Sequence, residues 1–322
     1  MRASQLMSGK ARRAISLPYW AHQARQFVLV HKGRSLASST KDGAGHYRSD
    51  QKNYNDSWQL RLDKLVEYIE SGESNIPDVL ALYRNYWLSG RYGIDEKVPF
   101  VVDGQSHQLL ASSGHIYYRH AMAHSVLAQV RPDTVAIIEL GSGFGESLFT
   151  VWHERFGDRK NTLRRNDTKF IASELSPAGR RASRVLATLD PLLNFEGRHF
   201  DYRTPRFDGL DFGSGHVVIF STQSIEQVSE IPDDFLPRVM ALGRNVTGLH
   251  FEPIGWQFTP QPEPDFVTRH RERCLSLNYN TNYWSMLDAA RREQKIEIEI
   301  AEPQYLGFEY NPLSKIVWKK KV

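Results

Sequence analysis

The stretch AIIELGSGFGESL, Ala136 to Leu148, decides the fold of this chain. Its apolar run ends in Glu139, and glycines follow at Gly141, Gly143 and Gly145. The apolar run predicts a buried strand, and the residues after the glycines predict a helix. Glycines at such a turn let a ligand approach the backbone, whose N–H groups face it at the helix N-terminus. The stretch therefore predicts a ligand-binding loop at the tip of a strand.

Strands and helices alternate from this stretch to the C-terminus. The predicted strands cover residues 135–140, 169–175, 194–202, 216–222, 245–253, 295–305 and 314–321, and helices are predicted at 145–157, 176–189, 231–243 and 282–294. Such alternation calls for parallel strands with crossover connections, and the last two strands suit an antiparallel pair at the sheet edge. We expect an α/β fold with a Rossmann-like, mostly parallel seven-stranded sheet and an antiparallel C-terminal edge.

The N-terminal third of the chain has helical periodicity at 57–72, 76–90 and 114–130. We expect residues 1–112 to form a helical cap on the acceptor side, and residues 113–322 to form the ligand-binding domain. Aromatic side chains in the cap can form its core or a lid that excludes water. These are Tyr19, Trp20, Phe27, Tyr47, Tyr54, Trp58, Tyr83, Tyr86 and Trp87.

Composition excludes several classes of protein. No apolar run approaches the roughly 20 residues that span a bilayer, and the N-terminus lacks the pattern of a secretory signal. Cys274 is the only cysteine, which rules out an intrachain disulfide and a Cys-based zinc cluster and favours a reducing cytoplasm. The net charge of +4 is too modest to predict a nucleic-acid partner.

The glycine spacing distinguishes between nucleotide ligands. Residues 141–145 read G-x-G-x-G, whereas a dinucleotide loop reads G-x-G-x-x-G. The carboxylate of Glu139 would also disfavour a pyrophosphate and suit a cationic ligand. The motif ELGSGFG, Glu139 to Gly145, resembles the first motif of class I S-adenosylmethionine-dependent methyltransferases. The resemblance covers the chain from about residue 116 to the C-terminus and implies S-adenosyl-L-methionine as cofactor.

Later strand ends carry the other landmarks that the resemblance implies. Glu174 matches the acid that accepts both ribose hydroxyls, and Asp201 the acid that binds the adenine amino group, although Asp201 could also cap its loop. Tyr202 could flank the ring. The implied cofactor-binding residues are Glu139, Gly141, Ser142, Gly143, Gly145, Glu174, Leu175, Asp201, Tyr202, Ser221 and Thr222.

Candidate catalytic residues follow the fourth and fifth strands. His250 has a near-neutral intrinsic pKa that suits a general base, and Glu226 and Glu252 could instead bind a cationic acceptor or orient His250. Gln223, Gln227 and Trp256 are expected to contact the acceptor, and no metal site is expected.

The sequence therefore predicts a methyltransferase acting on an O or N atom of a small metabolite, sugar or peptide-like natural product. The segments SIEQ (224–227) and HFEP (250–253) are also similar to sugar O-methyltransferase-like sequences. A catalytically inactive cofactor-binding partner subunit is the alternative, and a nicotinamide-dependent oxidoreductase is disfavoured by the glycine spacing. We expect a small-molecule acceptor and neither a nucleic acid nor a membrane as partner. The chain could also form a homodimer.

Overall fold

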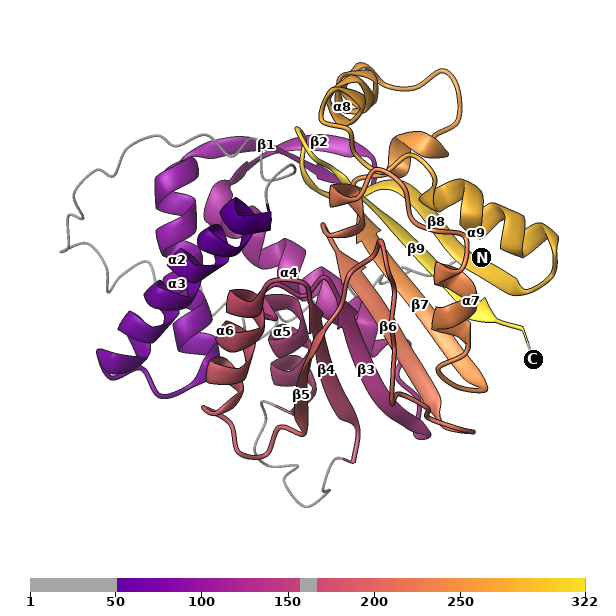
Figure 1. Ribbon diagram of the computed structural model, residues 1–322. Helices are drawn as coiled ribbons and strands as arrows, with labels where there is room; N and C mark the ends of the chain where they lie inside the picture. The colour runs from indigo at the N-terminus through magenta and orange to yellow at the C-terminus, as the bar shows by residue number, and fades with distance from the viewer. Residues whose placement is uncertain (1–50, 157–166, 322) are drawn as a thin grey trace, which may run out of the picture. The chain divides into compact units, whose positions relative to one another are not determined.

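The structure, a computed structural model, describes residues 51–156 and 167–321, which belong to one compact unit of the chain. Its strands are β1 (Lys97–Val102), β2 (Gln105–Leu110), β3 (Thr134–Leu140), β4 (Lys169–Glu174), β5 (Phe195–His199), β6 (His216–Thr222), β7 (Asn245–Glu252), β8 (Ile296–Phe308) and β9 (Leu313–Lys320). They form one sheet in the order β2-β1-β8-β9-β7-β6-β3-β4-β5 (Figure 1).

The sheet has a parallel half and an antiparallel half. Strands β5, β4, β3, β6 and β7 are parallel, and β9 then pairs antiparallel with both β7 and β8. Strands β3, β4 and β6 are buried along almost their whole length, as parallel strands covered on both faces are. The expected α/β architecture is confirmed, and each of the seven predicted strands is present.

The sheet has nine strands and not seven, because β1 and β2 form an additional hairpin. Strand β1 pairs with β8, so the β8–β9 pair predicted at the edge lies inside the sheet and β2 forms the edge. Asp103 and Gly104 make the hairpin turn with φ of +48° and +78°. Asp-Gly favours such a two-residue turn, because both residues tolerate positive φ. The helical cap predicted for residues 1–112 therefore also contains a β-hairpin, which was not predicted.

Helices cover both faces of the sheet. They are α2 (Gln51–Glu70), α3 (Ile76–Arg91), α4 (Ala111–Leu127), α5 (Glu146–Phe156), α6 (Pro177–Ala187), α7 (Phe235–Met240), α8 (Asp265–Ser276) and α9 (Tyr283–Arg292). Ile137 of β3 packs in a core with α4, α5 and α6, whereas its neighbour Ile138 packs with α7 and α9. Alternate residues of a strand thus serve opposite faces.

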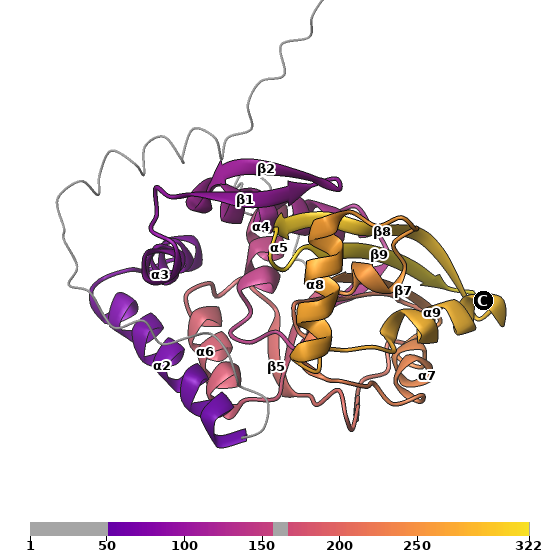
Figure 2. The ribbon, with the colours of Figure 1, turned by 90° about the horizontal axis from the view of Figure 1, so that it is seen from above.

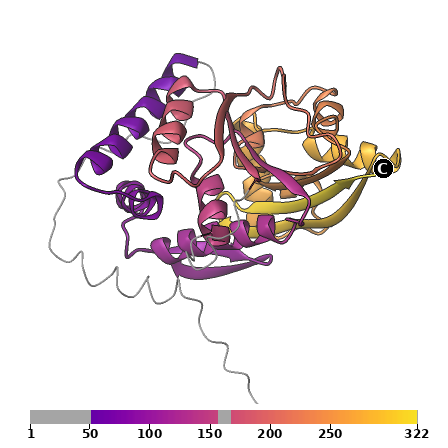
Figure 3. The ribbon, with the colours of Figure 1, turned by 90° about the horizontal axis from the view of Figure 1, so that it is seen from below.

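Helices α2 and α3 are the predicted cap helices, and α2 runs alongside α6 (Figure 2). Helix α4 packs beside the β1–β2 hairpin and β8 (Figure 3). Helix α8 was not predicted, because its sequence DFVTRHRERCLS is highly charged and buries only Val267, His270 and Cys274. Helix α7 is shorter than the predicted 231–243.

None of the described helices is both long and apolar enough to cross a membrane. Four of the aromatic lid candidates lie outside the described residues: Tyr19, Trp20, Phe27 and Tyr47.

Candidate functional site

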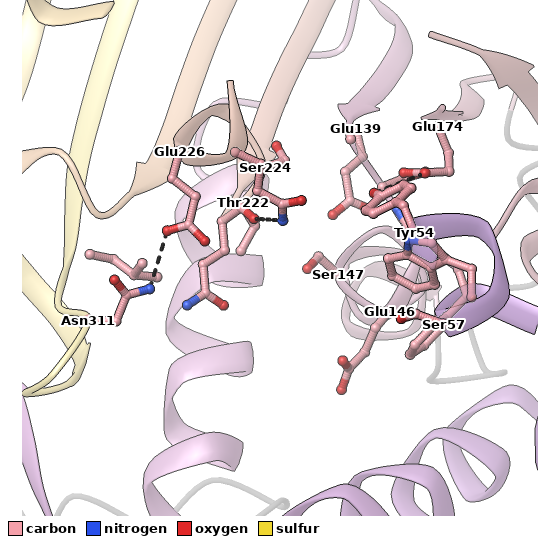
Figure 4. A pocket seen from close by; sticks show the side chains of 18 of the residues that line it. Tyr54, Ser57, Glu139, Glu146, Ser147, Glu174, Thr222, Ser224, Glu226 and Asn311 are labelled. Atoms are coloured by element: carbon pink, nitrogen blue, oxygen red, sulfur yellow. Dashed lines mark hydrogen bonds between the residues drawn. The ribbon is translucent and has the colours of Figure 1, made fainter. Parts of the chain in front are cut away.

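A cavity of about 1060 Å³ opens at the carboxyl ends of the parallel strands (Figure 4), where ligands bind in open α/β sheets. We call the part formed by the loops after β3, β4, β5 and β6 the strand-end wall. It consists of Gly141, Ser142, Gly143, Glu174, Leu175, Asp201, Tyr202, Thr222, Gln223 and Ser224. The part formed by α3 and α4 is the helix wall, which consists of Arg84, Trp87, His115, Tyr118 and Arg119.

The glycine loop has the predicted place at the tip of β3. Gly141, Gly143 and Gly145 have φ of +65°, +57° and +85°, a left-handed conformation that side chains disfavour. The N–H of Ser142 donates to Ser173 O at 3.0 Å, which ties the loop to the neighbouring strand β4. The loop conformation therefore requires these glycines whether or not a ligand is bound.

Protein side chains fill the space that two of the bare glycines leave. A Cβ on Gly141 would lie 2.4 Å from Cβ of Ser224, and one on Gly143 would lie 2.2 Å from the Trp58 ring of α2. At these two positions the backbone expected to face a ligand faces protein instead. The glycines thus allow close packing within the strand-end wall and beneath α2.

Glu139 is 2% exposed, and its Oε2 accepts the N–H of Leu148 at 3.1 Å. Burial raises the pKa of Glu139 to about 8, although the charge of Arg119 and the bond from Leu148 oppose the shift. This acid lines the cavity as predicted, and its bond also fixes the first turn of α5.

Glu174 lines the cavity at the tip of β4 and is also buried. Its Oε2 accepts the N–H of Gly143 at 2.9 Å, and its Oε1 accepts the N–H of Ser176 at 2.7 Å and the hydroxyl of Tyr54 at 3.3 Å (Figure 4). Burial raises the pKa of this carboxyl, whereas the two backbone donors lower it. A carboxylate offers about four lone pairs, so one acceptor position remains.

The tip of β5 carries Asp201 and Tyr202. Asp201 lines the cavity and accepts two bonds from the Arg203 guanidinium, at 3.0 and 2.9 Å, and one from its backbone N–H. Burial acts to raise the pKa of Asp201, but the bonds from Arg203 hold it below its usual value. The hydroxyl of Tyr202 bonds Leu140 O at 3.0 Å and Ser224 Oγ at 2.8 Å. Asp201 thus both caps its loop and faces the cavity, and Tyr202 locks the tips of β3 and β6.

The tip of β6 reaches the cavity through three of the predicted residues, Thr222, Gln223 and Gln227. Thr222 contacts Met122 of α4, its Oγ1 lying 3.0 Å from the sulfur. Ser221, by contrast, is fully buried below the rim and does not line the cavity.

The structure does not place His250 in the cavity, contrary to its predicted role as a general base. Its Nε2 accepts the Trp318 indole N–H at 3.0 Å, so its proton lies on Nδ1, which bonds Ser221 Oγ at 2.9 Å. Burial lowers the pKa of His250 to about 3. The imidazole is a neutral part of the sheet core with no nitrogen left for an acceptor.

Glu252 and Trp256 also lie away from the cavity lining. Both carboxylate oxygens of Glu252 accept the N–H of Ser224, at 3.2 and 3.0 Å, which holds the turn after β6. Burial raises the pKa of Glu252 to about 8, with a further contribution from Glu226. Glu252 is therefore a positioning residue for the rim, and neither residue is placed to contact the acceptor.

Glu226, in the short 3₁₀ helix Ile225–Gln227, is the one predicted catalytic residue that lines the cavity. It is 7% exposed, and its Oε2 accepts from Asn311 Nδ2 at 3.3 Å (Figure 4). Asn311 belongs to the turn between β8 and β9, and its Oδ1 lies 3.2 Å from His270 Nε2. The structure thus fixes a carboxylate between the tip of β6 and that turn.

Sequence reasoning missed the helix wall. Four of its polar atoms are buried and have no hydrogen-bond partner among residues 51–156 and 167–321: Arg84 Nε, His115 Nδ1, Tyr118 Oη and Arg119 Nε. Ser142 Oγ in the strand-end wall is in the same state. Buried polar atoms without partners are rare, and here they surround a cavity, which points to a ligand. The available signal was that His115, Tyr118 and Arg119 stand at helical spacing (i, i+3, i+4) in the predicted helix 114–130.

One group in the described part of the chain has the ligand geometry of a metal site, with nitrogen and oxygen atoms within 4.8 Å of one another: His120, His124 and Glu154. None of the three lines the cavity. Glu154 lies 2.6 Å from His120 Nδ1 and 3.2 Å from His124 Nε2, so the carboxylate alone accounts for the cluster.

No family model and no curated protein matches this chain. Among solved structures, a SAM-dependent methyltransferase from Aquifex aeolicus is 12% identical over 64% of this chain and 93% of its own, with a TM-score of 0.40. Mitomycin 7-O-methyltransferase MmcR is 13% identical, covering 82% of this chain and 68% of its own, with a TM-score of 0.41. Geranyl diphosphate C-methyltransferase from Streptomyces coelicolor A3(2) is 11% identical, covering 77% and 98%, with a TM-score of 0.42.

The chain spans 41% of the length of another similar structure, EvdMO1, at 14% identity and a TM-score of 0.36. Several of the solved structures that resemble this chain are thus methyltransferases, the class whose first motif its glycine loop resembles. A likeness at these identities describes the fold alone.

Proposed function

We propose that this protein is an S-adenosyl-L-methionine-dependent methyltransferase that methylates an O or N atom of a small metabolite, a sugar or a peptide-like natural product. One observation carries the proposal. The cavity joins a glycine loop to Glu174 and Asp201, carboxylates at the ends of the next two strands. This arrangement suits an adenosyl group, because two ribose hydroxyls and one adenine amino group can each donate to a carboxylate.

The residues present fit such a cofactor. Glu174 has one free acceptor position, and release of the Tyr54 hydroxyl would open a second, which matches the two ribose hydroxyls. Ser142 Oγ has no partner in the described parts of the chain and lies within the glycine loop. Asp201 faces the same cavity and would take the adenine amino group.

When bound, the cofactor supplies a methyl group on a positively charged sulfur. The chain has to orient the acceptor, keep water out and hold the acceptor's proton. Glu226 is placed for the last task, because Asn311 fixes its carboxylate inside the cavity. Such a carboxylate can accept the hydrogen of an acceptor hydroxyl or amine.

The N-terminal part of the chain would shape the acceptor side. Helices α3 and α4 supply the helix wall, and Trp58 and Tyr83 pack against Phe144 of the glycine loop at ring distances of 6.1 and 4.9 Å. We propose that residues 1–112 help to select the acceptor and that residues 113–322 bind the cofactor, with α4 and Glu226 of the second part also on the acceptor side. A reducing compartment such as the cytoplasm suits the single cysteine.

Calorimetry with S-adenosylhomocysteine and with NAD(H) tests the cofactor. The first should bind and NAD(H) should not. Glu174→Ala should raise the dissociation constant about tenfold or more, because a hydrogen bond to a charged group contributes roughly 1.5–3 kcal/mol. The control is Glu196→Ala, on β5 outside the cavity. An unchanged constant in a folded Glu174→Ala protein would sink the ribose assignment.

Turnover separates an enzyme from an inactive partner subunit. The protein should transfer a labelled methyl group to at least one member of a panel of sugars, hydroxylated metabolites and amines. Glu226→Gln should lower that turnover while leaving S-adenosylhomocysteine binding intact. Tight cofactor binding with no transfer to any acceptor, alone or with partner proteins, would favour the partner-subunit alternative.

A further inference from the structure

The cavity contains more arginines than its carboxylates can neutralise. The arginines that line it are Arg61, Arg84, Arg91, Arg119, Arg203 and Arg273. Two of them form ion pairs, Arg119 with Glu146 at 2.6 Å and Arg203 with Asp201 at 2.9 Å. For the other four, no carboxylate oxygen lies within 4.0 Å in the described parts of the chain.

Two of these arginines converge on one ring although they come from different helices. The guanidinium of Arg91, at the end of α3, lies 5.3 Å from the centre of the Tyr310 ring, and that of Arg273, on α8, lies 5.0 Å from it. We call Arg91 and Arg273 the arginine pair. The Tyr310 ring is itself fixed, because its hydroxyl lies 2.5 Å from that of Tyr92.

Stacking leaves the donors of the arginine pair available. A guanidinium over an aromatic ring keeps its N–H groups in its own plane, where they can form a fork for a carboxylate or phosphate. Arg273 donates one hydrogen bond to Tyr310 O, at 3.3 Å. The guanidinium of Arg91 also lies 5.4 Å from the centre of the Trp87 ring of the helix wall. The pair is therefore held in position while most of its donors stay unused.

The arginine pair lies in the part of the cavity distant from the glycine loop. Tyr310 is in the turn between β8 and β9, and in the sheet β9 is two strands from β6 and three from β3. At about 4.8 Å per strand, these separations are about 10 Å and 14 Å. The arginine pair is thus too far along the sheet to contact a group bound at Glu174 or Asp201. A ligand that reaches the tip of β6 could extend to the pair.

We propose that the methyl acceptor carries an anionic group, a carboxylate or a phosphate, and that the arginine pair binds it. This inference rests on the proposed function, because it assigns the acceptor half of the same cavity. Arg91 is exposed and Arg273 is half-buried, so both guanidinium groups are open to an anion that enters the cavity, and no carboxylate of the described chain competes for them. Glu226 lies between the arginine pair and the tip of β6, where the reacting hydroxyl or amine of such an acceptor would lie.

Calorimetry with pyrophosphate and with succinate tests the proposal at constant ionic strength. The two probes distinguish a phosphate from a carboxylate. At least one should bind with a millimolar or tighter dissociation constant, and Arg91→Gln and Arg273→Gln should each weaken it fivefold or more. The matched control is Arg269→Gln, one turn earlier on α8, which pairs with Glu309 and does not line the cavity.

Three outcomes would overturn the proposal: neither probe binds, Arg269→Gln weakens binding as much as Arg273→Gln, or the probe competes with S-adenosylhomocysteine. The last would assign the arginine pair to the cofactor. Measuring S-adenosylhomocysteine on the same samples keeps the two hypotheses apart. If it fails to bind, the proposed function falls whatever the anions do. If it binds equally to wild type and both variants while the anions do not bind, only the anionic acceptor falls.

Discussion

The two walls of the cavity are built on opposite principles. In the strand-end wall most polar groups bond one another: Glu174 holds three donors, Tyr202 bonds Leu140 and Ser224, and Glu252 holds Ser224 from below. In the helix wall Arg84, His115, Tyr118 and Arg119 each leave a buried polar atom without a partner in the described chain. The strand-end wall is therefore held in shape by hydrogen bonds within the protein. The helix wall has unused donors and acceptors that a ligand can satisfy.

Gly141→Ala tests how tightly the strand-end wall is packed, and we expect the largest loss here. A side chain at φ +65° costs about 1–2 kcal/mol, and its overlap with Ser224 adds about 1–3 kcal/mol. The free energy of unfolding in urea should fall by about 3 kcal/mol. Gly104→Ala is the control, because φ is +78° but no atom lies within 4 Å of the new Cβ. Equal losses would mean that the contact with Ser224 is unimportant.

The buried carboxyls of the strand-end wall should make stability depend on pH. Burial raises the pKa of Glu252 to about 8 in the folded state, against about 4.3 in a free chain. The folded protein then holds a proton that the unfolded chain has lost, so the free energy of unfolding falls as pH rises between these values. Glu139 acts in the same direction.

Urea unfolding at pH 6.5 and 8 measures this effect. Glu252→Gln should reduce the decrease over this range by about 2 kcal/mol, at roughly 1.4 kcal/mol per pH unit. The range stays above pH 6.5, because the lowered pKa of His250 acts only below it, where stability is lost as the pH falls. Exposed Glu297→Gln is the control. If the free energy of unfolding decreased as much in Glu252→Gln as in Glu297→Gln, Glu252 would not be protonated in the folded protein.

A pair of tyrosines compares the walls directly. Tyr202 and Tyr118 are 6% and 5% exposed, but only the Tyr202 hydroxyl has partners in the described structure. Tyr202→Phe should lower the free energy of unfolding by about 1 kcal/mol, because it removes the hydrogen bonds of this hydroxyl to Leu140 O and Ser224 Oγ. Tyr118→Phe should leave it unchanged or raise it. A loss from Tyr118→Phe matching that from Tyr202→Phe would remove the distinction between the walls.

We expect the smallest effect for Tyr54→Phe, and this effect is on ligand affinity and not on stability. The Tyr54 hydroxyl occupies an acceptor position of Glu174 that a ribose hydroxyl would need. Removing it should tighten S-adenosylhomocysteine binding about twofold to tenfold, the range of one ordinary hydrogen bond. Tyr68→Phe, on the same helix but outside the cavity lining, should change nothing. Weaker binding in Tyr54→Phe would show that the hydroxyl helps the ligand.

Much of the fold could be predicted, because apolar runs such as 135–140 and 216–222 are long and bounded by turn residues. The β1–β2 hairpin was missed because half of it, QSHQLL, is an exposed polar edge strand with no buried stripe. Helix α8 escaped notice for a similar reason, since most of its residues are charged.

The site was only half predictable. Residues just after parallel strands, such as Glu174 and Thr222, must gather at one rim, which sequence order alone reveals. The predicted role of His250 was wrong because this residue pairs in register with Ser221, one residue below the rim, and its ring points toward Trp318. Depth within a sheet and the facing of a strand residue are set by packing. The helix wall depends on how α3 and α4 pack, which no local pattern encodes.

The position of α2 affects how fast a ligand can bind. Its Tyr54 bonds Glu174, and its Trp58 lies against Gly143. We expect a nucleoside to take the second acceptor position of Glu174 only after the Tyr54 hydroxyl has moved away. Association that waits for such a motion is slower than a diffusional encounter. The observed rate constant of association stops rising at high ligand concentration, where the departure of Tyr54 from Glu174 becomes the slow step.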